Sequence, residues 1–237
     1  MHIMENFLPH PWWEIWWLVA LPFLALGVYR LKKVLAADRE ALPLLGVTGG
    51  FIFILSSLKL PSVTGSCSHP TGTGLSAISF GPWITSVIGV IVLLFQALFL
   101  AHGGLTTLGA NTVSMGIAGP LVGWGIYRAL RDTRLNIYGT VFLACTFADL
   151  FTYLVTSLEL ALAYPAKVGG VASSFTVFMG IFAVTQVPLA ILEGIILALV
   201  FKYVVHLKPE ILIRLKIFSE EKIMAARSDI DAIQIPA

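Results

Sequence analysis

The sequence predicts an all-α protein that crosses a membrane about seven times, and three observations lead to this fold class. Hydrophobic residues make up 57% of the 237 residues and charged residues only 12%, whereas soluble domains carry roughly 25% charged residues. The mean hydropathy is +0.89. Apolar runs of about 18 residues or more recur along the chain, each long enough to cross a hydrocarbon core of ~30 Å as a helix. We therefore predict one polytopic helix bundle over residues 1–208.

Six apolar segments have the length and composition of membrane-spanning helices. Tryptophans crowd the start of the first segment, where indole rings favour the membrane interface. The last segment is long and carries Pro188, which predicts a tilt or a kink. Residues 209–237 are expected to form a cytoplasmic tail, partly disordered from about Ser219 onward. The six segments are 12–34, 42–58, 83–102, 112–130, 136–158 and 174–205.

Basic residues predict the orientation of the bundle, because loops rich in Lys and Arg stay in the cytoplasm. No Lys or Arg precedes the first segment and four follow it between residues 30 and 39, so the N-terminus is expected outside. The basic residues at 128–134 and in the tail are then also expected inside. With six crossings, however, residues 128–134 would follow the fourth crossing and lie outside. The stretch 70–81 is the only candidate for a seventh crossing, and with it 13 of the 15 basic residues lie inside, leaving Lys59 and Lys167 outside. Being short and glycine-rich, it is expected to be buried among other helices, as broken segments at transporter sites are.

The first two residues predict a metal site. No basic segment precedes an apolar core here, so we expect no cleaved signal peptide, and a large second residue predicts that Met1 is retained. The α-amine of Met1, the amide nitrogen of His2 and its Nδ1 then fill three corners of a square, which suits Ni²⁺, Cu²⁺ or low-spin Co²⁺. His69 is the best fourth donor, because the same crossing count puts it at the outer face. A histidine at position 2 or in a loop is also compatible with an ordinary surface residue.

Other polar residues have two interpretations each. His102 either supports the ligands, replaces one of them, or closes a turn before two glycines. Asn111 either shapes the floor of the site, together with nearby threonines, or caps the helix that begins near Thr112. His10 is expected outside the site.

Two cysteines and two acidic residues complete the candidates. Cys67 and Cys145 lie far apart, so we expect no disulfide. Cys67, two residues before His69, either offers a thiolate or is a small loop residue, and we favour the loop residue. Asp149 and Glu193 lie within membrane segments, where an ionisable residue indicates either function or hydrogen bonding between helices. We favour hydrogen bonding.

Three segments carry a family resemblance: Met-His-Ile-Met-Glu at 1–5, Thr-Gly-Ser-Cys-Ser-His-Pro-Thr-Gly-Thr-Gly-Leu at 64–75, and His-Gly-Gly-Leu-Thr-Thr-Leu-Gly-Ala-Asn at 102–111. In this order, over roughly residues 1–210, the chain resembles the substrate-binding S component of energy-coupling-factor cobalt and nickel transporters, the CbiM/NikM family. The resemblance implies a metal held by nitrogens of Met1, His2 and His69, with the N-terminal segment dipping into the bundle. Cys67 stands where serine is usual in that family, and Asn6 where glycine is usual.

The resemblance also implies partners. A transmembrane coupling (T) subunit, ATPase (A) subunits and a small accessory membrane subunit are expected, in the cytoplasmic membrane of a bacterium or archaeon. The chain has no G-x-x-x-x-G-K-[ST] phosphate loop, so ATP hydrolysis is left to those partners and the chain itself is not expected to be an enzyme. The transported substrate is Co²⁺ or Ni²⁺, and the His-Gly-Gly form at 102–104 looks more like the cobalt branch, linked to cobalamin synthesis. The net charge of +2 is explained by topology and predicts no nucleic-acid partner.

Three alternatives remain open at this stage. The first is a nickel-specific S component. The second is a channel or a secondary metal transporter, driven by protons at Asp149 and Glu193. The third is a membrane redox protein with a His-ligated haem, because His2, His69 and His102 are expected at one face.

Overall fold

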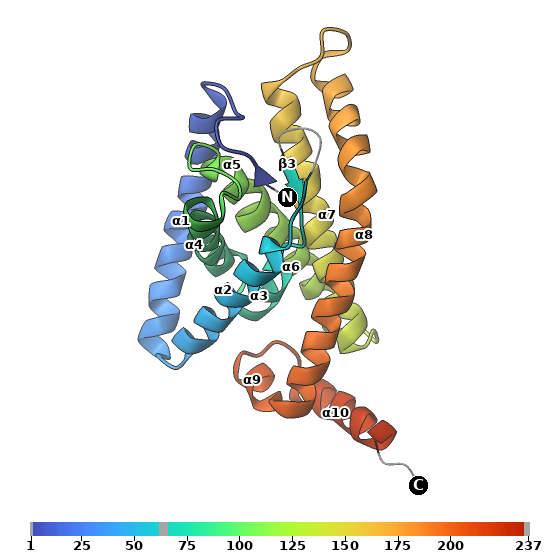
Figure 1. Ribbon diagram of the computed structural model, residues 1–237. Coiled ribbons are helices and arrows are strands. Elements are labelled where there is room, and N and C mark those ends of the chain that lie inside the picture. The colour runs from blue at the N-terminus through green and yellow to red at the C-terminus, as the bar shows by residue number, and fades with distance from the viewer. Residues whose placement is uncertain (1, 62–65, 235–237) are drawn as a thin grey trace.

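The computed structural model describes residues 2–61 and 66–234 as a helix bundle with one small sheet (Figure 1). This confirms the predicted all-α membrane class. The long helices are α1 (Trp12–Ala37), α2 (Ala41–Ser57), α4 (Pro82–Leu100), α7 (Ile137–Ala163) and α8 (Gly170–Leu207). The shorter elements are β1 (His2–Ile3), β2 (Leu60–Pro61), β3 (Ser66–Ser68), α3 (Thr73–Phe80), α5 (Leu108–Asn111), the π-helix η1 (Thr112–Ala118), α6 (Gly119–Leu130), α9 (Pro209–Arg214) and α10 (Glu220–Gln234).

Among the described residues, α4, α7 and α8 are long and apolar enough to cross a membrane by length and composition. Helix α2 is apolar but shorter, with 17 residues. Helix α8 stays helical through Pro188. Each predicted segment is found as a helix or a run of helices, while the count of seven crossings stays a prediction.

The stretch 70–81, predicted to be a short crossing, contains the eight-residue helix α3. It begins after Gly72, whose φ of +69° is one that glycine adopts without strain. The Glu193 carboxylate of α8 accepts hydrogen bonds from the backbone N–H groups of Thr71 and Gly72 at this helix start. Helix α3 packs closely on α7, because a Cβ at Gly74 would lie 2.7 Å from the Cys145 sulfur. A buried helix too short to span lipid is thus held by its neighbours.

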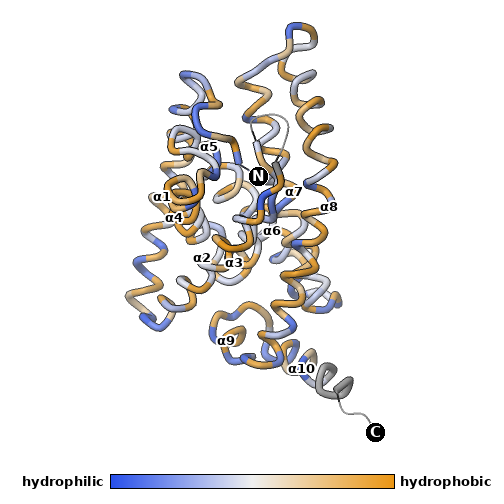
Figure 2. The backbone as a smooth tube through the Cα atoms, viewed as in Figure 1, coloured by the Kyte–Doolittle hydropathy of each residue, from blue (hydrophilic) through white to orange (hydrophobic). Residues whose placement is uncertain are grey.

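The basic connections gather at one end of the bundle. Arg214 of α9 pairs with Asp38 in the connection between α1 and α2, with Nε 3.0 Å from Oδ2. Lys222 of α10 donates to the Arg131 carbonyl at the end of α6, at 2.9 Å. Hydrophilic residues lie at the α1–α2 connection and, among hydrophobic ones, around α9, and others lie near the opposite end of the bundle (Figure 2). The charge clusters that the sequence assigned to one face do share one end of the fold.

The tail differs from the expectation of partial disorder, because residues 220–234 form helix α10. Ile223 is fully buried and packs in one cluster with Ile217, Phe218 and residues of α7 and α8. A few apolar side chains in a polar segment therefore order the tail against the bundle.

The packing of α7 against α8 is tested by two glycines on α8. A Cβ at Gly194 would lie 2.1 Å from the Thr146 hydroxyl oxygen, so Gly194→Ala should destabilise the protein by about 1–3 kcal/mol through overpacking. Gly180 has nothing within 4 Å of its Cβ position. Gly180→Ala should leave stability unchanged or raise it by about 0.5–1 kcal/mol. Thermal unfolding of the detergent-purified chain compares them, and equal unfolding temperatures would contradict this packing.

Candidate metal centre

The N-terminal segment enters the bundle as a strand. β1 pairs antiparallel with β3, His2 opposite Cys67, and β2 occupies the other edge of β3. The Ser66 hydroxyl donates to the His2 carbonyl at 2.8 Å. The next side chain, Ile3, is fully buried in a cluster with Leu160 of α7 and Phe182 of α8. The sheet and this apolar contact together place His2 inside the protein.

Asn111 completes the hold on β1 from the opposite side. Its Oδ1 accepts from the Ile3 N–H at 2.7 Å, and its Nδ2 donates to the Ile3 carbonyl at 3.0 Å. The Thr107 hydroxyl donates to the same carbonyl at 2.8 Å. Asn111 makes no capping hydrogen bond to the helix that follows it. Of its two predicted roles, support of the site fits and capping near Thr112 is wrong.

The chain after β1 is fixed by a turn. The Glu5 carboxylate accepts from the backbone N–H groups of Leu105 and Thr106. Asn6 has a φ of +58° and donates from its N–H to the Thr106 hydroxyl at 2.9 Å. Asparagine adopts this left-handed conformation more readily than other non-glycine residues. The departure from glycine at position 6 therefore leaves the turn intact.

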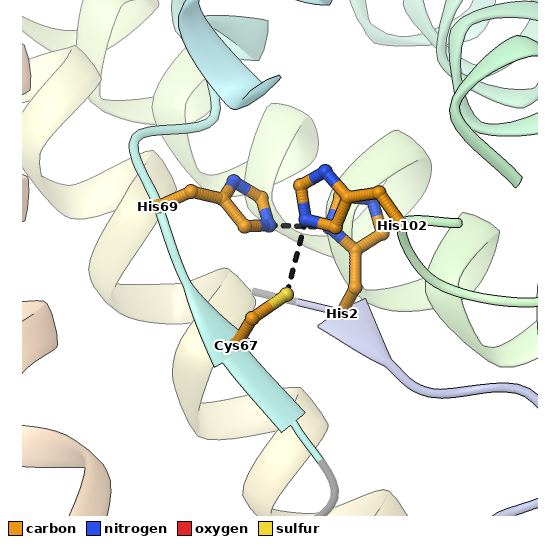
Figure 3. A group of neighbouring side chains, drawn as sticks. All are labelled: His2, Cys67, His69 and His102. Carbon is orange, nitrogen blue, oxygen red and sulfur yellow. Dashed lines mark hydrogen bonds between the residues drawn. The ribbon is translucent and has the colours of Figure 1, made fainter. Parts of the chain in front are cut away.

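Four side chains of metal-ligating type meet beside β1: His2, Cys67, His69 and His102 (Figure 3). One potential ligand atom from each lies within 4.8 Å of all the others. The His2 ring centroid is 4.3 Å from both the His69 and the His102 centroids. The exposed fraction of each residue is 3% or less. Three imidazoles and a thiol thus converge at one buried site.

Hydrogen bonding orients His69 toward His2. Its Nδ1 lies 2.8 Å from the Pro70 carbonyl and must donate to it, which leaves the Nε2 lone pair directed at the Nδ1 of His2. Two such nitrogens need a proton or a cation between them. Burial lowers the pKa of His2 and of His69 well below the usual 6.5, so both rings are neutral. The single ring proton of His2 then lies on Nδ1 and donates to His69 Nε2, and a cation can take the place of that proton. The arrangement suits a cation bound to both nitrogens.

The other two members of the cluster contact each other. The Cys67 sulfur lies 3.0 Å from His102 Nε2. Burial lowers the pKa of His102 to about 3 and raises the pKa of the Cys67 thiol. In the absence of metal the thiol is therefore protonated and donates to a neutral imidazole.

The predicted residues can now be placed. His2 and His69 come together as expected, and Met1 lies outside the described residues. His102 faces the cluster, which agrees with a supporting or ligating role. Cys67 faces it too, although the interpretation as a loop residue was favoured over that as a thiolate ligand. The sequence does contain an indication that Cys67 faces the site. Cys67 lies two residues before His69, and residues i and i+2 of an extended segment share one face. His10 is exposed and pairs with Glu14, away from the cluster.

A buried hydrogen-bond chain supports His69 from α7 and α8. The Gln186 Nε2 donates to the His69 carbonyl at 3.1 Å and to the Asp149 carboxylate oxygens at 2.7 and 2.8 Å. With Glu193 at the start of α3, these contacts confirm the favoured interpretation of both acidic residues as hydrogen-bonding partners between elements. They also fix the backbone that carries His69.

Comparison with known proteins points to metal transport. Residues 2–211 match the family model CbiM, described as "Cobalt uptake substrate-specific transmembrane region". The chain is 64% identical over 232 residues to a putative cobalt transport protein, CbiM 2, of Methanosphaerula palustris, covering 98% of this chain and 99% of that one. It is 60% identical over 201 residues to the cobalt transport protein CbiM of Chlorobium limicola, covering 85% and 79%. A crystal structure of a transition metal transporter superposes with a TM-score of 0.75 at 27% identity, covering 86% and 92%.

The hold on β1 is tested at Asn111. Asn111→Leu removes both hydrogen bonds to Ile3 and should weaken Co²⁺ binding by roughly 10- to 100-fold, the range for losing a group that orients a ligand. Asn136→Ala is the matched control, because Asn136 caps α7 through Gly139 N–H at 2.7 Å, far from the cluster in sequence. It should lower stability and leave affinity unchanged. Calorimetric titration of both variants measures this, and equal affinities would rule out the supporting role.

Proposed function

The chain belongs to the CbiM family of cobalt uptake membrane components, and we propose that it is the substrate-binding S component of an energy-coupling-factor importer. Residues 1–208 form its metal-binding membrane domain and 209–237 its cytoplasmic tail. The chain recognises Co²⁺ and partner subunits hydrolyse ATP. The enclosed cluster around His2 supports this role, because a site for capture and release needs ligands but no catalytic group.

The proposed ligands are four nitrogens: the Met1 α-amine, the His2 amide nitrogen, His2 Nδ1 and His69 Nε2. The single observation that carries this set is the close approach of His2 Nδ1 to His69 Nε2, with the His69 tautomer fixed by Pro70. Four nitrogens in a plane suit low-spin Co²⁺ and Ni²⁺. Cobalt is the substrate named for the relatives, so we assign Co²⁺, and nickel is the alternative.

The proposed cycle begins at the outer face of the cytoplasmic membrane of a bacterium or archaeon. The N-terminus lies outside, and the N-terminal segment occludes the partly dehydrated ion while Asn111 and Glu5 hold the segment in the bundle. A T subunit, a pair of A subunits and a small accessory membrane subunit then reorient the bundle with ATP, and the ion leaves inside for cobalamin synthesis. The basic connections lie at the end of the bundle that is farther from β1 (Figure 1), which supports this orientation.

The remaining alternatives have less support. A proton-driven transporter or channel would use Asp149 and Glu193, but both carboxylates accept hydrogen bonds that fix the His69 segment. Cobalt uptake that persists without any ATPase partner would favour that alternative. A haem between the histidines is disfavoured, because the imidazole centroids lie 4.3–4.9 Å apart, closer than two rings on opposite faces of a macrocycle can lie.

Removing the His69 imidazole tests the ligand set. His69→Ala should weaken Co²⁺ binding by on the order of 100-fold or more, beyond the range typical of losing a supporting group. His10→Ala removes an exposed imidazole instead and should change affinity little. Both affinities are measured on the purified chain. If the two variants bind equally well, His69 is not a ligand.

The pH dependence of Co²⁺ binding gives a second test. His2 and His69 have lowered pKa values, so they stay neutral and compete little with protons between pH 8 and 6. The amine and the amide nitrogen must each lose a proton, so affinity should fall on acidification by about one to two log units per pH unit. Titrations at several pH values measure the slope. A flat profile over this range would argue against amine and amide ligands.

A further inference from the structure

Two potential ligand atoms of the cluster have no part in the proposed planar chelate. They are the Cys67 sulfur and His102 Nε2, which lie 3.0 Å apart beside the two histidines that the chelate uses. The four side chains come from three segments: β1, β3 with the residue after it, and the connection after α4. They point toward one another around a common centre (Figure 3). Such convergence from separate segments is typical of a ligand set.

The spacing fits a tetrahedral ion. A tetrahedral Zn²⁺ with bonds of about 2.0–2.3 Å holds its ligand atoms roughly 3.3–3.8 Å apart. In the structure, one ligand atom from each of the four side chains lies within 4.8 Å of the other three. Small rotations of side chains therefore suffice to bring all four into bonding distance. One sulfur and three imidazole nitrogens are also the donor types that zinc takes in proteins.

The hydrogen bonding of the rings points to a ligand at the same place. His2 Nε2 and His102 Nδ1 are buried and have no hydrogen-bond partner among the described residues. The remaining nitrogen of each ring contacts only another member of the cluster. Buried polar groups in proteins are normally satisfied. The three imidazole centroids lie 4.3–4.9 Å apart. An ion bound to the inward nitrogens would leave the ring protons on the outer nitrogens, His2 Nε2 and His102 Nδ1.

We propose that His2, Cys67, His69 and His102 form a second coordination mode at this centre, a tetrahedral site that holds Zn²⁺ or high-spin Co²⁺ through side chains alone. The thiol proton of Cys67 is released to solvent when the sulfur binds the ion. This mode shares His2 and His69 with the proposed chelate but uses neither the amine nor the amide. The tetrahedral site can therefore be tested independently of the planar chelate. Because both modes use His2 and His69, Zn²⁺ competes with the planar ion for the site.

The experiment separates the two modes by displacing the α-amine. Gly-Ser placed before Met1 moves His2 to fourth place and removes the chelate. Two residues are used, because a histidine in third place completes a planar chelate of its own. The extended chain should still bind Zn²⁺ within about tenfold of the native affinity, since zinc prefers the tetrahedral side-chain set. With Co²⁺ it should show the intense visible bands of a tetrahedral ion and a sulfur-to-cobalt charge-transfer band.

Two cysteine variants of the extended chain identify the sulfur. Cys67→Ser should abolish the charge-transfer band and weaken Zn²⁺ binding by on the order of 100-fold. Cys145→Ser, the matched control at a buried cysteine of α7, should change neither. An extended chain that binds no Zn²⁺, or a Cys67→Ser variant that keeps both band and affinity, overturns the proposal.

A third variant guards against misfolding. His102→Gln in the chain with its native N-terminus should weaken Zn²⁺ binding more than Ni²⁺ binding, and an unchanged thermal unfolding temperature shows that the fold is intact. Equal Zn²⁺ affinity in this variant and the native chain would contradict the role of His102.

Discussion

The centre depends on one constraint: two residues of backbone must lie as a strand inside a membrane-embedded helix bundle. Buried backbone N–H and C=O groups need partners there, because no water is available to satisfy them. β3 pairs with one edge of β1. At the other edge, the Asn111 side chain forms hydrogen bonds with both the N–H and the C=O of Ile3, as a neighbouring strand would. His2 reaches His69 only because these partners hold the strand. Without these partners, burial of the N-terminal backbone would leave its polar groups without hydrogen bonds.

Two buried carboxylates, those of Glu193 and Asp149, support the segment that carries His69. Glu193 binds the backbone at the start of α3, and Asp149 binds Gln186, which in turn binds the His69 carbonyl. A short helix, a glycine with positive φ and the His69 segment are thereby tied to α7 and α8. Rotation of those helices would move the ligand segment. The same contacts thus link the metal centre to α7 and α8.

The sequence predicted which segments meet at the metal centre, but it predicted less well which side chains face that centre. Charge bias and the count of crossings brought His2, His69 and His102 to one end, and chelate chemistry singled out the first two. The inward direction of Cys67 and the pairing of Asn111 with Ile3 depend on the register of β1 against β3, which is set by contacts between residues more than 60 positions apart. The order of α10 depends likewise on Ile223 reaching a distant cluster. Local patterns do not contain such long-range contacts.

We propose that the metal is held by the α-amine of Met1 together with nitrogens of His2 and His69. The most direct measurement is Co²⁺ affinity after Gly-Ser is placed before Met1, made in a Cys67→Ser background so that binding through side chains alone does not obscure the result. The account predicts a loss of on the order of 100-fold or more relative to Cys67→Ser with the native N-terminus, because amine and amide ligands are both removed. An unchanged affinity would contradict it.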